Sequence, residues 1–228
     1  MKEQSTTKGF AILSAAGMLV KILSIIYIPL FMRIVGDEGY GLYGASYQIY
    51  TFVYVLTNSG IPVAISKLIS ELNAVGNYRD AVKGFKIARF MLMAMGIVMA
   101  ALLMIFASPL SRVMKYSKIY LSLLSLAPAI LFTSVASAYR GYFQGSGNMT
   151  PTAVSQVIEQ IVNTIFGIAF AAYLIKYGVE VGCVGAPIGT SLGALASACF
   201  LMFCYENSRR SGMYKKMTVQ RSERIDTG

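Results

Sequence analysis

Thr150–Gly167, with the sequence TPTAVSQVIEQIVNTIFG, is an apolar stretch that nevertheless carries Gln156, Glu159, Gln160 and Asn163. On an α-helix, positions i, i+3, i+4 and i+7 share one face, and the four polar residues have this spacing. A charge at the centre of a bilayer costs about 2.5–3.5 kcal/mol, so such residues normally face a bundle interior or a water-filled cavity. The polar stripe therefore predicts a membrane helix that lines a polar cavity. Interhelical hydrogen bonding is the alternative.

The composition of the whole chain is that of a membrane protein. The 228 residues are 56% hydrophobic and 13% charged, whereas soluble domains are about one quarter charged. The sequence has no histidine, which is the commonest general base and metal ligand. It also shows no Gly-rich phosphate loop and no metalloprotease motif, and its three cysteines are widely spaced. We therefore expect a protein that is not an enzyme and that has no metal or other cofactor.

The apolar residues occur in six runs, each near the roughly 20 residues that a spanning helix needs. These runs predict an all-α, polytopic membrane protein with six transmembrane helices. The predicted spans are Phe10–Met32, Leu42–Ile65, Ile87–Leu110, Ile119–Ala138, Thr152–Ile175 and Val181–Cys204.

The distribution of basic residues predicts the orientation. If both termini are cytosolic, fourteen Lys and Arg residues lie inside and five lie outside, which satisfies the positive-inside rule. Six of the fourteen are in the tail after the last apolar run, and a basic flank of this kind suits anionic headgroups rather than nucleic acid. Residues 1–205 are thus expected to form one transmembrane unit, and residues 206–228 a basic cytosolic tail or linker. Ser66–Arg89 is expected to form an amphipathic helical hairpin on the inner membrane surface, with Asn77 at its turn.

Other polar and aromatic residues mark a candidate substrate cavity. Lys21 lies at the middle of the first span, from where snorkelling is difficult, so it is expected to face the interior and to meet an anion, either a phosphate or Glu159. The second span carries an aromatic stripe that either lines the cavity or packs internally. Its members are Tyr43, Tyr47, Tyr50, Tyr54 and, at the end, Asn58.

Small residues and prolines indicate how the helices pack and where one is broken. Gly185, Gly189 and Gly193 form two small-xxx-small steps, which are typical of tight helix packing. Ser122, Ser125, Ala129 and Thr133 share a face of the fourth span for the same reason. The segment TNSGIP, residues 57–62, predicts a helix break with Gly60 and Pro62 as a hinge.

Two stretches carry a resemblance to a known family. They are RIVGDEGYGLYGASYQIYTFVYVLTNSGIPVAISKLISE, residues 33–71, and YRGYFQGSGNMTPTAVSQVIEQ, residues 139–160. The chain resembles the stage V sporulation protein B and polysaccharide-biosynthesis branch of the multidrug/oligosaccharidyl-lipid/polysaccharide flippase superfamily, which also contains the lipid II flippases.

The resemblance implies one six-helix lobe of a V-shaped, two-lobe transporter of the bacterial plasma membrane. It implies alternating-access flipping of an undecaprenyl-linked oligosaccharide or a peptidoglycan precursor, driven by protons, sodium or the membrane potential. The second lobe would come from a missing part of a truncated chain, which we favour, or from a second copy. In lipid II flippases, basic residues of the first helix are thought to meet the pyrophosphate. Lys21 matches the first of these positions, whereas the next falls near Tyr27.

Two other classes of function remain open. A cation-coupled multidrug exporter of the same fold would use Glu159 as its proton or sodium carboxylate. Outside this superfamily, the chain could be a six-helix structural partner for another membrane protein or half of an ATP-driven exporter.

Overall fold

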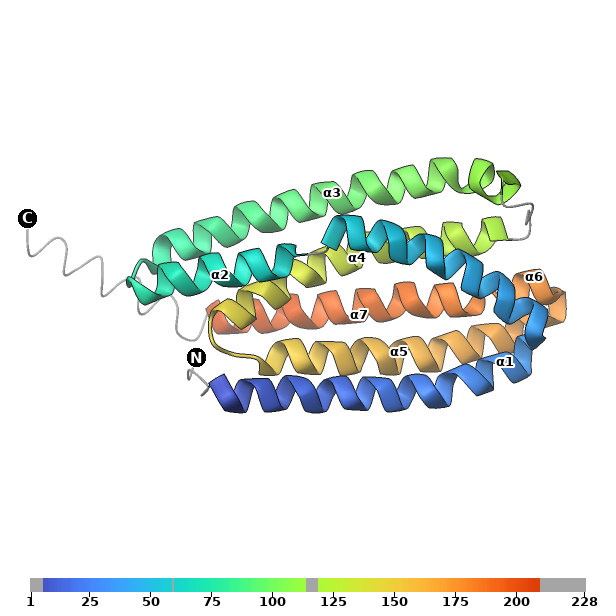
Figure 1. Ribbon diagram of the computed structural model, residues 1–228, viewed down its shortest axis with the longest axis horizontal. Helices are drawn as coiled ribbons and strands as arrows, with labels where there is room; N and C mark the ends of the chain where they lie inside the picture. Colours follow the sequence, from blue (N-terminus) through green and yellow to red (C-terminus); the bar gives the residue numbers. More distant parts are fainter. Residues whose placement is uncertain (1–5, 59, 114–118, 210–228) are drawn as a thin grey trace, which may run out of the picture.

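The computed structural model describes residues 6–58, 60–113 and 119–209. It is a bundle of long helices that run along one axis (Figure 1). The elements are α1 (Thr6–Asn58), α2 (Ile61–Ala74), α3 (Tyr78–Val113), α4 (Tyr120–Gly145), α5 (Thr150–Leu174), the short 3-10 helix η2 (Ile175–Tyr177), α6 (Val179–Gly182) and α7 (Gly185–Ser208). Five helical stretches of the described residues are long and apolar enough to cross a membrane.

The first two predicted spans are the two arms of α1. A straight helix of 53 residues would be about 80 Å long, far longer than the roughly 30 Å hydrocarbon core. Gly36 interrupts α1 with φ of 70° and ψ of −179°, a conformation that a residue with a side chain rarely adopts. The second arm then returns along the bundle (Figure 1). The kink thus lets α1 form both of the first two predicted spans. The predicted all-α membrane fold is confirmed.

The helix break that TNSGIP predicts is also present. Asn58 ends α1, and Gly60 adopts φ of 79° immediately before α2, whose first turn contains Pro62. The second span was predicted to continue to Ile65, but this residue belongs to α2. Ile65 is buried against α4, because Gly141 and Gly145 have no side chains to keep the two helices apart. The predicted second span therefore contains the helix break and the first turn of α2.

The hairpin between the second and third spans exists, but its predicted orientation was wrong. The turn includes Asn77, whose side-chain amide donates to a carboxylate oxygen of Asp80 at 2.7 Å. However, α3 is one unbroken helix from Tyr78 to Val113, so its beginning cannot lie flat on a surface while its end crosses the membrane. The hairpin of α2 and α3 continues along the bundle axis instead (Figure 1). One side of the hairpin packs against α4.

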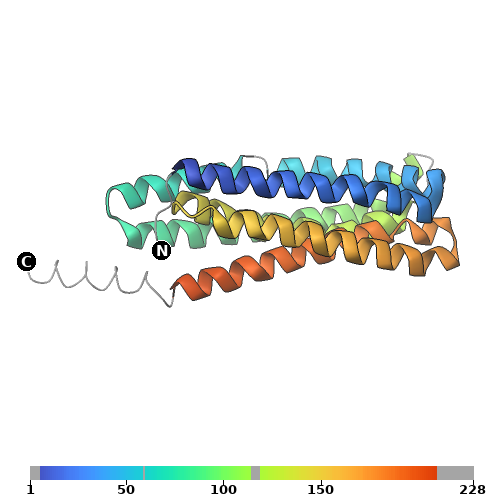
Figure 2. The ribbon, with the colours of Figure 1, turned by 90° about the horizontal axis from the view of Figure 1, so that it is seen from below.

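The interior is organised around α4 and around the contact of α5 with α7. Helix α4 is the most completely buried of the five long helices, and it packs on α3, α7 and α2. Helix α5 lies between α7 and the first arm of α1 in Figure 1, α7 crosses α5 in Figure 2, and both α1 and α7 contact α5. The start of α1, the α2–α3 turn, the α4–α5 loop and the end of α7 share one end of the bundle (Figure 1).

The small-residue stripe of the last span has the packing role that the sequence predicts. A Cβ atom added to Gly189 would lie 2.6 Å from the backbone nitrogen of Gly167, and one added to Gly193 would lie 2.5 Å from the carbonyl oxygen of Glu159. At Gly185, such an atom would meet the backbone of Ala171. The backbones of α5 and α7 are therefore in direct contact. In α4, the carbonyl of Ser125 accepts a hydrogen bond from Ser191 of α7 at 2.5 Å.

Candidate functional site

The polar stripe of α5 is only partly buried. Gln156, Glu159, Gln160 and Asn163 are all half-buried, whereas Gly167 at the end of the stripe is fully covered. Asn163 accepts a hydrogen bond from the Thr190 hydroxyl of α7 at 3.4 Å, and Gln160 donates to Thr164 at 3.4 Å. The stripe thus combines interhelical hydrogen bonding with polar atoms that remain accessible.

Glu159 is paired with a residue that the sequence analysis did not include in the site. Its carboxylate accepts a hydrogen bond from the Arg140 guanidinium of α4 at 2.6 Å, rather than from Lys21. Only 14% of the Arg140 side chain and 28% of the Glu159 side chain are exposed. Because an unpaired charge in such a place is very unfavourable, the pair is what allows Glu159 to lie in this helix.

Arg140 also joins a third helix to the site. The same guanidinium donates to Ser155 of α5 at 3.1 Å and to Ser197 of α7 at 2.8 Å. Arg140 lies two residues beyond the predicted end of the fourth span, Ala138, and the continuation of α4 to Gly145 brings it into the bundle. Its position at the start of the RGYFQG motif, residues 140–145, is the sequence signal that could have identified Arg140 as a site residue.

The four tyrosines of the second arm of α1 form a continuous stack. The ring centroids of successive pairs, from Tyr43 through Tyr47 and Tyr50 to Tyr54, are 5.4, 5.5 and 6.2 Å apart. These are distances at which aromatic pairs attract each other. Tyr50 is 6% exposed, whereas Tyr47 is 39% exposed and is the most accessible of the four. Packing therefore accounts for Tyr50, whereas Tyr47 remains accessible from outside the bundle.

The aromatic stack crosses the kink of α1. The Tyr43 ring lies 5.3 Å from the Phe31 ring on the first arm, and the Phe31 ring lies 5.7 Å from that of Tyr27. Tyr27 is buried, and its hydroxyl has no hydrogen-bond partner among the described residues. Two aromatic side chains therefore hold the arms of α1 together beside Gly36.

The structure brings the aromatic stack and the polar stripe of α5 close together. Helix α1, which carries the tyrosines, packs on α5, which carries Glu159 and the rest of the polar stripe. The predicted cavity residues of two helices therefore share one region of the bundle.

Of the remaining predicted site residues, Lys21 is exposed and the others lie at or beside the break between α1 and α2. Lys21 is exposed on the first arm of α1. Asn58 is buried at the end of α1, where its side-chain amide donates to the hydroxyls of Thr57 at 3.0 Å and Ser134 at 3.4 Å. Gly60 and Pro62 lie at the break between α1 and α2. Among the described residues, no group of three or more Cys, Asp or Glu side chains could hold a metal ion.

A bundle of long apolar helices with an internal ion pair and half-buried polar stripes defines a polytopic α-helical membrane protein. The chain belongs to the polysaccharide biosynthesis protein family, whose model matches residues 6–223. It is 33% identical over 207 residues to stage V sporulation protein B of Bacillus subtilis (strain 168), covering 90% of this chain and 40% of that protein. It is 27% identical over 222 residues to the lipid II flippase MurJ of the same organism, covering 92% of this chain and 41% of that protein. The chain therefore spans about 40% of the length of these relatives.

Solved structures show the same fold at low sequence identity. A multidrug resistance MATE family transporter of the MOP superfamily, in an outward-facing conformation, matches with a TM-score of 0.72 and 17% identity over 89% of this chain and 45% of that chain. A MOP superfamily transporter from Pyrococcus furiosus Vc1 (DSM3638) matches with a TM-score of 0.70 and 16% identity over 88% and 45% of the two chains. The resemblance stated from the sequence motifs is thus confirmed, and the bundle has the fold of about half of a MATE-type chain.

Proposed function

We propose that this chain forms one lobe of a flippase that moves an undecaprenyl-linked oligosaccharide or a peptidoglycan precursor across the plasma membrane. The lobe would work by alternating access with a second six-helix lobe or a second copy of itself. Membership of the polysaccharide biosynthesis family and the similarity to a lipid II flippase support this class of cargo. The observation that carries the proposal is the packing of α1 on α5, because it joins the helix of the accessible Tyr47 to the helix of the half-buried polar stripe inside an apolar bundle.

The ion pair supports an anionic cargo. A lone carboxylate facing the route would repel a pyrophosphate, but Arg140 compensates the charge of Glu159. In the proposal, Lys21 meets the anionic headgroup, whereas Tyr43, Tyr47, Tyr50 and Tyr54 with the α5 stripe line the path of the sugar. Tyrosine rings and amide side chains suit sugars because they offer apolar faces together with hydrogen-bonding groups.

The proposed orientation places both termini in the cytosol. The end of the bundle that holds the start of α1 and the end of α7 also carries the basic α2–α3 hairpin (Figure 1). Basic residues concentrate on the cytosolic side of membrane proteins, which supports this orientation. The proposal includes no enzymatic step and no resident cofactor. Transport would be driven by protons, sodium or the membrane potential, and the break at Gly60 and Pro62 would act as a hinge.

The test is translocation of a fluorescent undecaprenyl-pyrophosphate sugar in proteoliposomes. Three proteins are compared: this chain, the Bacillus subtilis lipid II flippase, and a chimera in which this chain replaces the matching part of that flippase. The proposal expects translocation by the chimera, and a loss of about tenfold or more when the chimera carries Lys21→Ala. The matched control is Lys67→Ala, which removes an exposed lysine of α2 paired with Glu71 at 3.8 Å.

A cation-coupled multidrug exporter is the second candidate, because Glu159 is a carboxylate within a membrane helix. In that case the chimera would extrude cationic dyes in a proton or sodium gradient, and Glu159→Gln would abolish the extrusion. An inserted chimera that extrudes dye but leaves the lipid-linked sugar in place would overturn the flippase proposal.

A further inference from the structure

Helix α3 has a surface that faces away from the bundle. Most buried residues of this helix recur on one side, towards α4, and they are Ala81, Phe85, Leu92, Gly96, Leu103 and Ala107. At 100° per residue, Arg79, Lys83, Lys86 and Phe90 lie on the opposite side. All four are exposed. Helix α3 therefore has one face fixed in the protein and one face that no described residue covers.

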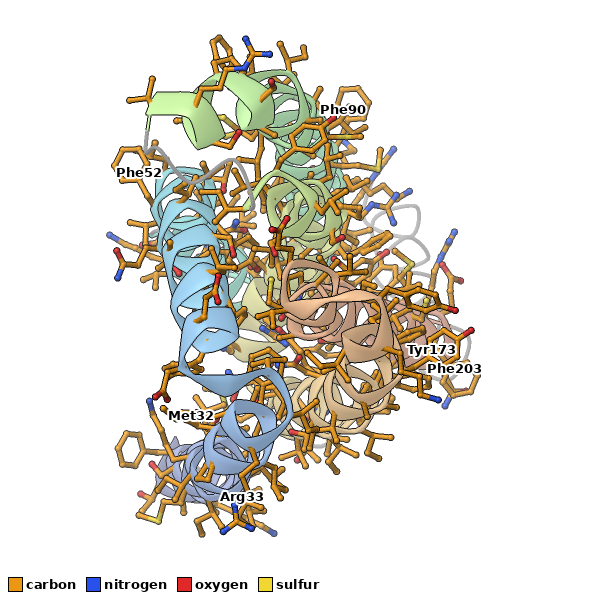
Figure 3. The ribbon with its side chains drawn as sticks, turned by 90° about the vertical axis from the view of Figure 1, so that its right-hand side faces the viewer. Met32, Arg33, Phe52, Phe90, Tyr173 and Phe203 are labelled. Atoms are coloured by element: carbon orange, nitrogen blue, oxygen red, sulfur yellow. The ribbon has the colours of Figure 1, made fainter. Side chains whose placement is uncertain are left out.

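The exposed face changes from basic to apolar within one turn. Lys86 and Phe90 are four residues apart, which is about 6 Å along the helix. Phe90 is 66% exposed and points away from the bundle (Figure 3). The same face continues with Met93, Ile97 and Met104, which are also exposed. Cations followed by an apolar stripe on a straight helix match the boundary between lipid headgroups and acyl chains.

Arg89 has a different role from the cations of this face. Its guanidinium donates to the Tyr139 hydroxyl at 2.8 Å and lies 6.0 Å from the centre of the Phe85 ring. Phe85 in turn packs against Tyr142 and Tyr205, with ring centroids 4.6 and 5.0 Å away. Arg89 thus links the first turns of α3 to α4. This link fixes the position of the exposed cations along the bundle axis.

The charge of the exposed face is only partly compensated. Lys83 and Asp80 form an ion pair at 3.3 Å, but both side chains are about half exposed or more, so the attraction is weak. Arg79 and Lys86 leave a net positive charge beside the apolar stripe. Such a face suits a ligand that combines a phosphate group with a hydrocarbon chain.

We infer that the outer face of α3 from Arg79 to Ile97 is a binding site for an anionic glycerophospholipid of the bilayer. Its phosphate would lie at Arg79, Lys83 and Lys86, and an acyl chain would lie along Phe90, Met93 and Ile97. Charge complementarity selects an anionic headgroup over a zwitterionic one, and each basic residue near an anionic membrane surface contributes about 1 kcal/mol. This lipid site is independent of what the lobe transports.

The sequence contains no tryptophan, so Phe90→Trp introduces a single fluorophore at the proposed site. The variant is reconstituted in vesicles of brominated phosphatidylglycerol, brominated phosphatidylcholine and their mixtures, because bromine quenches tryptophan only on contact. The site predicts that phosphatidylglycerol is preferred next to the introduced indole and that added salt weakens this preference. Changing Lys86 to Gln should reduce the preference by up to about fivefold, and changing Arg79 to Gln as well should reduce it further.

Two controls make the result decisive. Lys67→Gln in the same Phe90→Trp background removes an exposed cation of α2 outside the face and should leave the preference unchanged. Phe203→Trp reports a second outward-pointing aromatic position, on α7, and should be quenched by both lipids (Figure 3). An equal preference for the two lipids in the Phe90→Trp variant would overturn the inference. So would the absence of quenching in Phe90→Trp when Phe203→Trp is quenched, because it would mean that another protein covers this face.

Discussion

The Arg140 guanidinium lies 2.6 Å from the Glu159 carboxylate and connects α4 to α5. Because the same nitrogen also donates to Ser197 of α7, one side chain joins three helices at a single point. The interaction makes Glu159 an internally compensated group rather than a free charge in the membrane. Its importance can be tested by changing each partner separately.

Removal of either partner of this pair should destabilise the lobe. Glu159→Gln leaves the Arg140 charge half-buried without compensation, and Arg140→Gln does the same to the carboxylate. We expect each variant to lose up to about 3 kcal/mol of unfolding free energy. Reversible unfolding in mixed micelles measures the effect, and the double variant should lose less than the sum of the two single losses.

The control for this experiment is the exposed pair of Lys67 and Glu71, whose side chains are 77% and 64% exposed. Glu71→Gln should change the unfolding free energy by less than about 1 kcal/mol. Equal effects of Glu71→Gln and Glu159→Gln would show that the internal pair has no special role.

Gly193→Ala should separate α5 from α7. The new methyl group would lie 2.5 Å from the carbonyl oxygen of Glu159, and a backbone atom cannot move aside as a flexible side chain can. Overpacking of this kind costs about 1–3 kcal/mol. Gly17→Ala is the control, since no atom lies within 4 Å of its added methyl group. Unfolding that is unchanged in both variants would disprove the close contact.

Gly36→Ala tests the kink of α1 separately from packing. No atom lies within 4 Å of a Cβ added at Gly36 or at Gly41, but only Gly36 has a positive φ, of 70°. The difference between the two alanine variants therefore measures backbone strain, which we expect to be about 1–3 kcal/mol. Asn at position 36 should be tolerated no better than Ala, because a positive φ combined with a ψ near 180° is open essentially only to glycine. Thermal unfolding of the three variants provides the comparison.

Alanine substitutions of Tyr47 and Tyr50 should distinguish a loss of transport from a loss of stability. In the chimera that tests the proposed function, Tyr47→Ala should reduce translocation about tenfold, or about 1.4 kcal/mol, while leaving most of the stability intact, because the ring is 39% exposed. Tyr50→Ala removes a buried ring and should destabilise the lobe by about 3–5 kcal/mol. Translocation that is insensitive to Tyr47 at normal protein levels would remove this residue from the proposed path.

The α2–α3 turn should weaken in acid. Hydrogen bonds from Asn77 and Lys83 lower the pKa of the Asp80 carboxyl below its usual value of 3.8. A lowered pKa means that the ionised carboxylate stabilises the turn above the usual pKa and that this stabilisation is lost as the pH falls through the lowered value. Asn77→Ala should raise the pKa of Asp80, which a carboxyl-carbon NMR titration measures. A titration curve that Asn77→Ala does not change would contradict the hydrogen bond.

The sequence predicts the helical class, the helix break at Gly60 and the close α5–α7 contact, because each depends on a local pattern. Runs of apolar residues, a Gly-x-Pro sequence and glycines spaced by four all have direct physical meanings. The orientation of the α2–α3 hairpin has no such signature. It is decided by Gly141 and Gly145 of α4, more than 60 residues from the hairpin's first turn, whose missing side chains admit α2.

The partner of Glu159 could not be read from spacing alone. Arg140 lies 19 residues before Glu159, and only the packing of α4, α5 and α7 brings the two together. Spacing placed Lys21 and Glu159 in the same predicted cavity, but it gives no distance between helices that are far apart in the chain. The tyrosine stripe was correctly placed on one helix face, whereas the difference in exposure between Tyr47 and Tyr50 depends on which neighbours cover each ring.

The contact between the glycines of α7 and the backbone of α5 has a mechanical consequence. Side chains can change rotamer and let two helices slide, but two backbones in contact have no such freedom. These two helices, linked by Arg140 to α4, therefore form the stiff half of the lobe. Helix α1 is the compliant half, because it rests on α5 through side chains, is interrupted at Gly36 and ends at Asn58. Elastic deformation of this bundle will concentrate in α1, so a label on that helix will report shape changes that a label on α7 will miss.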